Sequence, residues 1–303
     1  MNFISSIPGY QCYTLYHMGH PLTKMRTQDV SPLLMEIPQP PEEVWVRGTL
    51  PLSDAKCLAV VGSRDYTDYG RQVVEYLVGG LRGHRVSIIS GLALGIDAHA
   101  HTAALDAGLH TLAVPGSGID DSVIYPRSNR PLAARILTEG GGLLSEFDPT
   151  FEAAPWSFPQ RNRIMAGLSH AILLIEAGER SGTLITARLA AEYNRDLLAV
   201  PGSIFSEKSR GTHQFLKLGA TPVANPADIL DALHIDVEAP SQGTEDSLPE
   251  AEQAVLMALT EPQDHDALVR LLALPAEEVL ALLMRMELAG RIREDNGTFF
   301  RMN

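Results

Sequence analysis

The residues with the clearest potential for chemistry lie in the segment FPQRNR, which runs from Phe158 to Arg163. Pro159 fixes the start of a helix and so places Arg161, Asn162 and Arg163 in its first turns. The helix dipole disfavours cations there, which indicates that an anion offsets their charge. A flat aromatic ring beside arginines is typical of single-stranded nucleic-acid binding, in which arginines contact phosphates and bases stack on the ring.

A structural interpretation of the same segment is equally open. In that case Phe158 belongs to the core, and the arginines pair with Glu146 or Glu176, which follow predicted strands. The two glutamates are also candidates for a general base, although capping a loop or anchoring an arginine is the simpler role. Because the chain has no nucleophile elbow and no HExxH motif, we predict no catalytic residue.

Metal binding has weak support. His99 and His101 in GIDAHAH are two residues apart and point away from each other on a helix. Asp97 and His101 are four apart and can pair, most simply as a structural contact. The cysteines, Cys12 and Cys57, form neither a metal spacing nor a disulfide framework. We expect no metal and a reducing cytoplasm as the setting.

The elements that must position these residues alternate regularly from residue 57. Apolar runs occur at 57–62, 86–91, 111–116, 142–147, 171–177, 197–202 and 221–225. Segments of helical character separate most of them. Continuous apolar strands alternating with helices predict a doubly wound α/β domain with a mainly parallel sheet.

Small residues follow five of these strands. They are Gly62-Ser63-Arg64, Ser90-Gly91, Gly116-Ser117-Gly118, Ser181-Gly182-Thr183 and Pro201-Gly202-Ser203. Ligands of open parallel sheets lie outside the carboxyl ends of the strands, where glycine turns and helix N-termini bring backbone N–H groups to an anion. One such turn has a conformational explanation. Five together predict a phosphate-binding crevice.

The phosphate ligand is not a common cofactor. The first turn is VGSRDYTDYG rather than GxGxxG, the second strand has no acidic residue at its end, and GxxxxGK[ST] does not occur. NAD and ATP are therefore disfavoured, and we predict no cofactor.

Charge is unevenly distributed over the 303 residues, whose formal net charge is −13. Residues 236–246 have no basic and four acidic residues, and residues 247–303 have five basic and ten acidic residues, which together give −9. A nearly neutral central domain can still focus positive potential in one cleft, so nucleic acid is not excluded. No apolar run reaches the length of a membrane span, and the N-terminus lacks a secretion signal, so we expect no membrane partner.

These patterns divide the chain into four parts. Residues 1–48 are expected to form an extended N-terminal extension, 49–235 the α/β domain and 236–246 a linker. In residues 247–303, three helical segments precede a hairpin signal at Asn296-Gly297, which predicts a small winged-helix domain.

Several of these motifs, in this order, resemble the DNA-processing protein A (Smf) family between about residues 32 and 235. They are GSRDYTDYG, SGLALGIDAHAH, GSGID followed by YPRSN, GLLSEFDP, FPQRNRIMAGLS, IEAGERSGTLITARLAAE and GTHQFLKLGA. The resemblance implies a Rossmann-like domain that binds single-stranded DNA and forms a homodimer. It also implies that this domain protects incoming strands and loads a RecA-type recombinase onto them during natural transformation.

The resemblance also implies a binding pocket. Its residues would be Gly62, Ser63, Arg64, Ser90, Gly91, Gly116, Gly118, Phe158, Arg161, Asn162 and Arg163. Two departures stand out. Pro155 replaces a lysine that several members carry, and the residues before the match are too few for the helix-hairpin-helix domain of many members.

Two alternatives come from enzyme classes. Nucleotide-cleaving phosphoribohydrolases of the same superfamily have PGGxGTxxE, whereas this chain has RSGTLITARLAAE, with the Gly-Thr kept and the glutamate displaced. An NAD-dependent reductase is disfavoured by the missing fingerprint.

The winged helix is expected to contact protein rather than DNA. Its predicted recognition helix, PAEEVLALLMRMELAG, has three glutamates and one basic residue, Arg285, and negative charge repels a phosphate backbone. An alternative stays open, in which the predicted wing binds duplex DNA through Arg291, Arg293 and Arg301.

Overall fold

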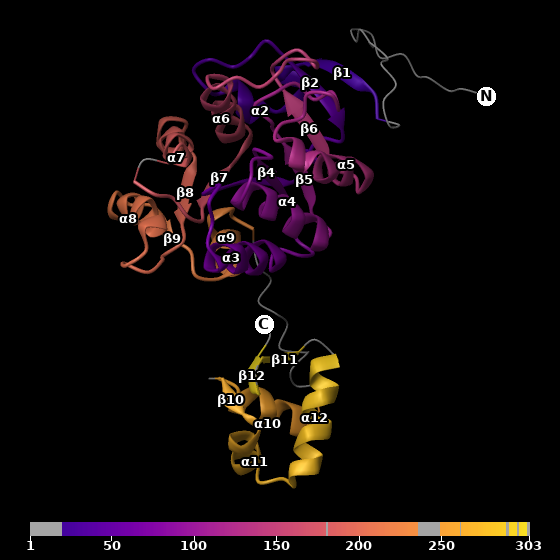
Figure 1. The fold of residues 1–303 in the computed structure, drawn as a ribbon, viewed down its shortest axis with the longest axis vertical. Coiled ribbons are helices and arrows are strands. Elements are labelled where there is room, and N and C mark those ends of the chain that lie inside the picture. Colours follow the sequence, from indigo (N-terminus) through magenta and orange to yellow (C-terminus); the bar gives the residue numbers. More distant parts are fainter. Residues whose placement is uncertain are drawn as a thin grey trace, which may run out of the picture. The chain divides into compact units, whose positions relative to one another are not determined.

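The computed structural model describes residues 20–179, 181–235, 249–260, 262–288, 291–295 and 297–301. The chain forms two compact units, Met1–Asp236 and Val237–Asn303, and each is described by itself (Figure 1). The predicted linker, residues 236–246, lies outside the described residues.

The first unit alternates strands and helices. Its strands are β1 (Leu22–Arg26), β2 (Glu43–Gly48), β3 (Lys56–Val61), β4 (Val86–Ser90), β5 (His110–Ala113), β6 (Gly142–Ser145), β7 (Ala171–Leu174), β8 (Asp196–Ala199) and β9 (Thr221–Pro222). Its helices are α1 (Thr27–Val30), α2 (Pro32–Met35), α3 (Asp68–Gly79), α4 (Ile96–Asp106), η1 (Arg127–Asn129), α5 (Arg130–Thr138), α6 (Ser157–Leu168), α7 (Thr183–Glu192), η2 (Glu207–Ser209), α8 (Arg210–Lys217) and α9 (Pro226–Ala232).

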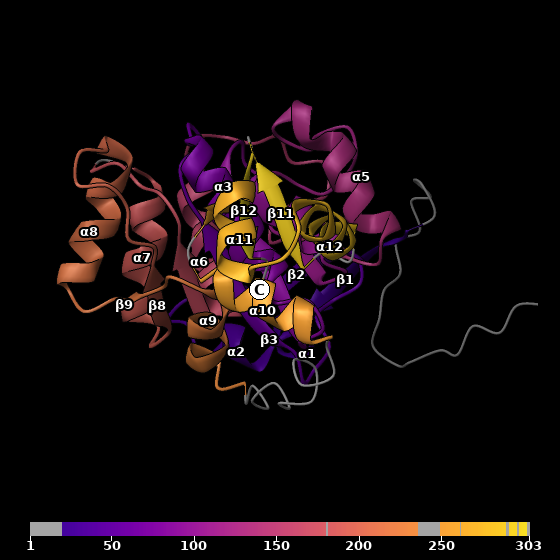
Figure 2. The same ribbon diagram turned by 90° about the horizontal axis from the view of Figure 1, so that it is seen from below.

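The nine strands form one sheet in the order β1-β2-β6-β5-β4-β3-β7-β8-β9. From β6 to β9 all neighbours are parallel, and only the β1–β2 and β2–β6 pairs are antiparallel. Each of the seven apolar runs forms a strand, which confirms the doubly wound, mainly parallel fold. The segment β5-β4-β3-β7-β8-β9 has the strand order of a Rossmann fold. Figure 2 shows α7 and α8 at one side of this unit and α5 at the other.

The central strands are buried on both faces, which explains their continuous apolar sequences. In β3, Leu58 and Val60 pack in one core with residues of α3, α4 and α9. Ala59 and Val61 point the other way, into a core shared with α6 and α7. Successive side chains of a strand alternate between faces, so one apolar run serves two layers of helices.

Residues 22–48, predicted to be an extended lead-in, contribute two strands to the sheet. Val46 of β2 pairs with Leu144 of β6, and β1 pairs with the outer edge of β2. Only Val44 and Val46 of β2 are buried apolar residues, so the periodic signal is short and was missed. The remainder of the predicted extension, residues 1–19, lies outside the described residues.

The second unit is a winged helix. It contains α10 (Glu250–Ala258), β10 (Gln263–Asp264), α11 (His265–Leu272), α12 (Ala276–Leu288), β11 (Ile292–Asp295) and β12 (Thr298–Arg301), with its sheet in the order β10-β12-β11. Gly297 has a φ of +81°, as the predicted hairpin turn requires, while Asn296 lies outside the described residues. Its helices and strands share a separate apolar core.

Exposed apolar side chains occur in both units. In the first, Ile204, Phe205 and Leu218 are 77%, 91% and 80% exposed, before and after α8. In the second, Leu280 and Met284 are exposed one turn apart on α12. Among the described residues, no helix is long and apolar enough to cross a membrane.

We expect a chain that ends at Ile235 to fold without the winged helix, because the apolar cores of the first unit contain no residue beyond it. A single cooperative thermal transition, followed by circular dichroism, is the expected result. Exposed Phe205 remains on this fragment, so a full chain that self-associates should do so in sedimentation without the winged helix as well. An unfolded or purely monomeric fragment, beside a dimeric full chain, would show that the winged helix is required.

Candidate nucleic-acid interface

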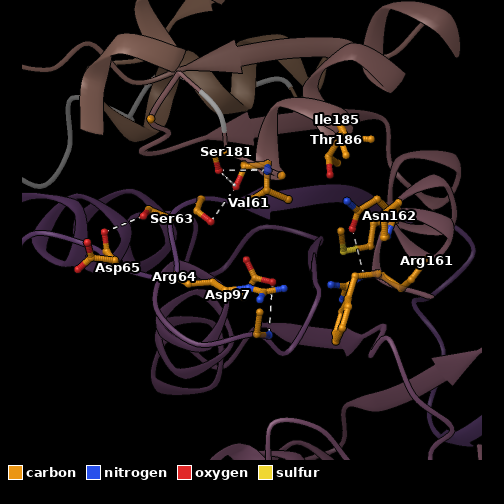
Figure 3. A pocket seen from close by; sticks show the side chains of 18 of the residues that line it. Val61, Ser63, Arg64, Asp65, Asp97, Arg161, Asn162, Ser181, Ile185 and Thr186 are labelled. Atoms are coloured by element: carbon orange, nitrogen blue, oxygen red, sulfur yellow. Dashed lines mark hydrogen bonds between the residues drawn. The ribbon is translucent and has the colours of Figure 1, made fainter. Parts of the chain in front are cut away.

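A cleft of about 580 Å³ opens at the carboxyl ends of the parallel strands (Figure 3). The turn after β3 forms one wall and the start of α7, which follows β7, forms another. Strands β4 and β5 are added on one side of β3, and strands β7, β8 and β9 on the other. Doubly wound folds bind ligands at such a switch point, which here lies between β3 and β7. The volume suits a ligand the size of a nucleotide.

The two turns at the switch point are joined by hydrogen bonds. The Thr183 hydroxyl at the start of α7 donates to the Gly62 carbonyl (3.0 Å), and the Thr183 amide donates to the Ser181 hydroxyl (3.2 Å). The Ser63 carbonyl accepts from the amide of Ile96 at the start of α4 (3.2 Å). Small hydroxyl residues thus hold the strand ends together and also line the cleft.

Arg161 is buried at the floor of the cleft, with 4% of its surface exposed. Its guanidinium donates to the carbonyls of Gly91 and Val114, the first residues after β4 and β5. A Cβ atom at Gly91 would lie 2.0 Å from the guanidinium, so this glycine makes room for the arginine. Burial lowers the pKa of Arg161 to about 10, which leaves it charged at neutral pH.

The anion that offsets Arg161 belongs to the protein. Asp97, in the first turn of α4, is buried and accepts hydrogen bonds from the amides of Gly91 (3.2 Å) and Ala93 (3.4 Å). Burial raises the pKa of Asp97, and the charge of Arg161 works against that rise. Two backbone carbonyls and the nearby charge of Asp97 thus accommodate a cation in the first turns of α6.

Arg163 points away from the cleft. It forms an ion pair with Glu146 and donates to the carbonyl of Gln39 (2.5 Å). Glu176 is buried and accepts from the amide (3.0 Å) and the hydroxyl (2.5 Å) of Thr67, just before α3. Both glutamates therefore have the structural roles that the sequence left open, an arginine anchor and a loop cap.

Phe158 lines the cleft and is not a core residue. Its ring lies against Gly116, where a Cβ would be 2.5 Å from the ring. The Arg64 guanidinium carbon lies 5.2 Å from the ring centroid, a cation–π contact. In the described part of the chain, the Arg64 side chain makes no ion pair, and it is exposed. A planar ring and a free guanidinium thus face the same opening.

Lys208, from η2, is a cation of the cleft that sequence analysis missed. It pairs with Asp65, whose side chain is 89% exposed, so the pair is weak. The described lining residues include three cations, Arg64, Arg161 and Lys208, against two carboxylates, Asp65 and Asp97. The cleft therefore has a net positive charge in an acidic chain.

Nine of the predicted site residues line the cleft. They are Gly62, Ser63, Arg64, Phe158, Arg161, Asn162, Ser181, Gly182 and Thr183. The described lining does not include Ser90, Gly91, Gly116, Ser117, Gly118 or Arg163. Most of these support the cleft from behind: the Ser90 hydroxyl donates to the Val60 carbonyl (2.7 Å), and that of Ser117 to the Gly118 carbonyl (2.9 Å).

The histidines of GIDAHAH diverge. The His99 ring lies against Tyr66 at 4.5 Å, whereas His101 is buried with its Nδ1 2.7 Å from the Thr111 hydroxyl. The described residues contain no group of three or more potential ligands that could hold a metal.

A family model described as DNA recombination-mediator protein A matches residues 22–234, and one described as the DprA winged helix domain matches residues 239–298. A Rossmann-like domain with this cleft and a winged helix is thus the architecture of a known class of proteins. The chain belongs to the DNA recombination-mediator protein A family.

Among its relatives, Protein Smf of Escherichia coli (strain K12) is 35% identical over 307 residues, covering 98% of this chain and 81% of the relative. DNA processing protein DprA of Streptococcus pneumoniae (strain ATCC BAA-255 / R6) is 42% identical over 197 residues, 65% of this chain and 68% of the relative.

Two solved structures are similar over most of the chain. DprA from Streptococcus pneumoniae has a TM-score of 0.64 at 39% identity, covering 71% of this chain and 74% of that one. DNA processing protein A from Helicobacter pylori, whose structure is described as giving insights into a unique single-stranded DNA binding mode, has a TM-score of 0.63 at 28% identity. That match covers 70% of this chain and 96% of the other.

The stability of the protein should depend on pH through buried His101. Burial lowers its pKa to about 3, so between pH 6.5 and 3 the unfolded chain binds a proton that the native chain does not. Its contribution to the free energy of unfolding is therefore complete above pH 6.5 and falls by about 1.4 kcal/mol per pH unit below it. The difference in unfolding free energy between the native protein and His101→Gln, measured in denaturant from pH 7 to 4, should shrink with that slope. Parallel curves would mean that folding does not lower the pKa of His101.

Proposed function

We propose that the chain binds single-stranded DNA in the cleft at the β3–β7 switch point. The observation that carries the proposal is the contact between Arg64 and Phe158, a free guanidinium and an aromatic ring that face the same positively charged opening. Arginine neutralises phosphate and a ring accepts any base, which together give binding without sequence preference. The single-strand binding described for the Helicobacter pylori protein supports the proposal.

Each part of the cleft has a separate role in this proposal. Arg64 and Lys208 meet phosphates, because Arg64 is free and Lys208 is held only by an exposed carboxylate. Phe158 stacks under a base. Arg161 holds the strand ends in place and adds its charge from below, while Arg163 meets no phosphate in the cleft.

The proposed activity is binding rather than catalysis. A phosphoribohydrolase would need a glutamate three residues after the Gly-Thr pair, and that position is Thr186, which lines the cleft. The displaced Glu192 is exposed at the end of α7 and is not among the described lining residues. No observation favours the hydrolase, and incubation with nucleoside monophosphates tests it through release of free base.

We further propose that the bound strand is protected and passed to a RecA-type recombinase during natural transformation, with the protein acting as a homodimer. The description of the family as recombination mediators supports the hand-over. The exposed apolar residues Ile204, Phe205 and Leu218 support self-association, because large apolar side chains this exposed are candidates for protein contacts.

The winged helix is proposed to contact protein. Exposed Leu280 and Met284 lie on the helix that in DNA-binding winged helices enters the groove, beside exposed Glu277 and Glu278. The wing gives little support to duplex binding, since Arg291 is paired with Glu252.

The main experiment measures affinity for oligothymidine and for duplex DNA over a range of salt concentrations. Single strands should bind more tightly, with a slope of log affinity against log salt of about −0.7 per phosphate neutralised. Arg64→Ala and Lys208→Ala should each flatten that slope by about 0.7. Arg163→Ala, which changes an arginine of FPQRNR outside the cleft, should leave it unchanged.

Arg85→Ala is the matched control. Arg85 is 73% exposed and lies just before β4, at the amino ends of the parallel strands, whereas the cleft lies at their carboxyl ends. Equal slopes for the native chain and for the Arg64 and Lys208 variants would remove the cleft as the binding site. Tighter binding of duplex than of single strands would contradict the proposed ligand.

Recombinase loading has its own test. If the protein hands its strand over, it should shorten the lag before a RecA-type recombinase hydrolyses ATP on DNA coated with single-strand-binding protein. Arg64→Ala should lose the effect in proportion to its lost affinity, because the strand must first be held. A lag that the native protein leaves unchanged would restrict its role to binding.

A further inference from the structure

The motif YPRSN, residues 125–129, lies next to the cleft but outside its described lining. It belongs to the loop after β5. The ring centroid of Tyr125 lies 5.8 Å from that of Phe158, with the two planes inclined by 55°. Tyr125 is 49% exposed, although it packs against a cleft residue. Phe158 therefore has Arg64 on the cleft side and a second aromatic ring beyond it.

The loop is held firmly against the cleft wall. The Asn129 amide group donates to the carbonyls of Leu92 (2.9 Å) and Ala93 (3.0 Å), and Ala93 lines the cleft. Arg130 donates to two carbonyls within the loop, those of Ser122 and Ile124. Tyr125 is thus presented on a fixed support, which lowers the entropy cost of binding a ligand.

The loop also has an uncompensated cation. Arg127 is exposed and makes no ion pair among the residues that the structure describes. The nearby carboxylates of the loop are already engaged: Asp121 pairs with the buried Arg47, and Asp120 accepts from the amide and hydroxyl of Ser122. An exposed ring and a free guanidinium two residues apart repeat the combination of Phe158 and Arg64.

The other exposed aromatic near Phe158 has the opposite surroundings. Trp156 is 56% exposed and rests on Phe147 and Phe151, but exposed Asp148 and Glu152 lie in the same loop. Hydrogen bonds from Thr150 lower the pKa of Asp148 and keep it ionised. Two carboxylates repel a phosphate backbone, so charge favours a path over Tyr125.

We propose that Tyr125 and Arg127 form a second nucleotide site, in which the base that follows the one on Phe158 stacks on Tyr125 and its phosphate meets Arg127. This inference rests on the proposed function. It predicts the path of the strand, which leaves the cleft over the loop that follows β5. The two ring planes are inclined by 55°, whereas successive bases along one strand of a duplex stack nearly parallel, about 3.4 Å apart. Bases lying on both rings would therefore be unstacked from each other, as a single strand allows.

The test compares oligothymidines of increasing length on the full chain. Tyr125→Ala should weaken binding of long oligothymidines roughly 5- to 150-fold without changing the salt slope, because stacking releases no counterions. Tyr125→Phe should bind like the native chain, and Arg127→Ala should flatten the slope by about 0.7. With a mononucleotide, whose single base is taken up by Phe158, the three variants should match the native protein.

The controls are an aromatic and a cation far from the proposed path. Tyr76→Ala removes a 46% exposed tyrosine near the end of α3, and Arg85→Ala removes an exposed arginine before β4. Neither change should alter affinity or slope.

Photocrosslinking of the unmodified chain to oligonucleotides with 5-iodouracil at each position gives an independent result. Crosslinks to both Tyr125 and Phe158, from adjacent nucleotides, are expected by mass spectrometry. Crosslinks at Phe158 alone, or native affinity of Tyr125→Ala beside weakened Arg64→Ala, would overturn the second site. A loss in Trp156→Ala rather than Tyr125→Ala would overturn the predicted path of the strand. Native affinity of Arg64→Ala as well would instead refute the cleft and hence the proposed function.

Discussion

The Arg161 guanidinium, 4% exposed, donates to the carbonyls of Gly91 and Val114, which begin the loops after two neighbouring strands. Its charge is met by Asp97, which is itself bonded to backbone amides of one of those loops. Loss of either group would leave the other buried with less compensation for its charge, which is destabilising. The position of Phe158, three residues earlier on α6, depends on this anchor. The cleft is therefore built on a buried arginine that holds two strand ends together, and the other lining groups are arranged around it.

The same construction explains how an acidic protein can have a cleft with a net positive charge. With Arg161 matched by Asp97, and Lys208 weakly matched by Asp65, the surplus charge belongs to Arg64. Of the net charge of −13, −9 lies in residues 236–303, so the first unit is much less acidic than the whole chain. Local arrangement rather than overall composition decides the sign of the potential that a ligand meets.

The glycine turns at the strand ends have two different purposes. Gly62 lies in the cleft itself. Gly91 and Gly116 are behind it, where the absence of a Cβ lets the Arg161 guanidinium and the Phe158 ring approach the backbone. Glycine turns along one edge of the sheet thus line the cleft at Gly62 and Gly182, and at Gly91 and Gly116 they make room for the side chains that form it.

The sequence by itself determined the fold class, the seven strands from β3 to β9 and the winged helix, and it singled out FPQRNR, four residues of which line the cleft. These follow from patterns that a chain carries locally, since burial on both faces gives continuous apolar runs and a hairpin turn favours glycine. Only the tertiary structure decided which arginine lines the cleft. Arg163 forms an ion pair with Glu146, whereas Arg161 donates hydrogen bonds to two backbone carbonyls. It alone brought Lys208 to Asp65, 143 residues away, and no periodicity records a contact of that separation. An ion pair forms between groups that the fold brings close together, and the order of residues along the chain does not by itself determine which groups those are.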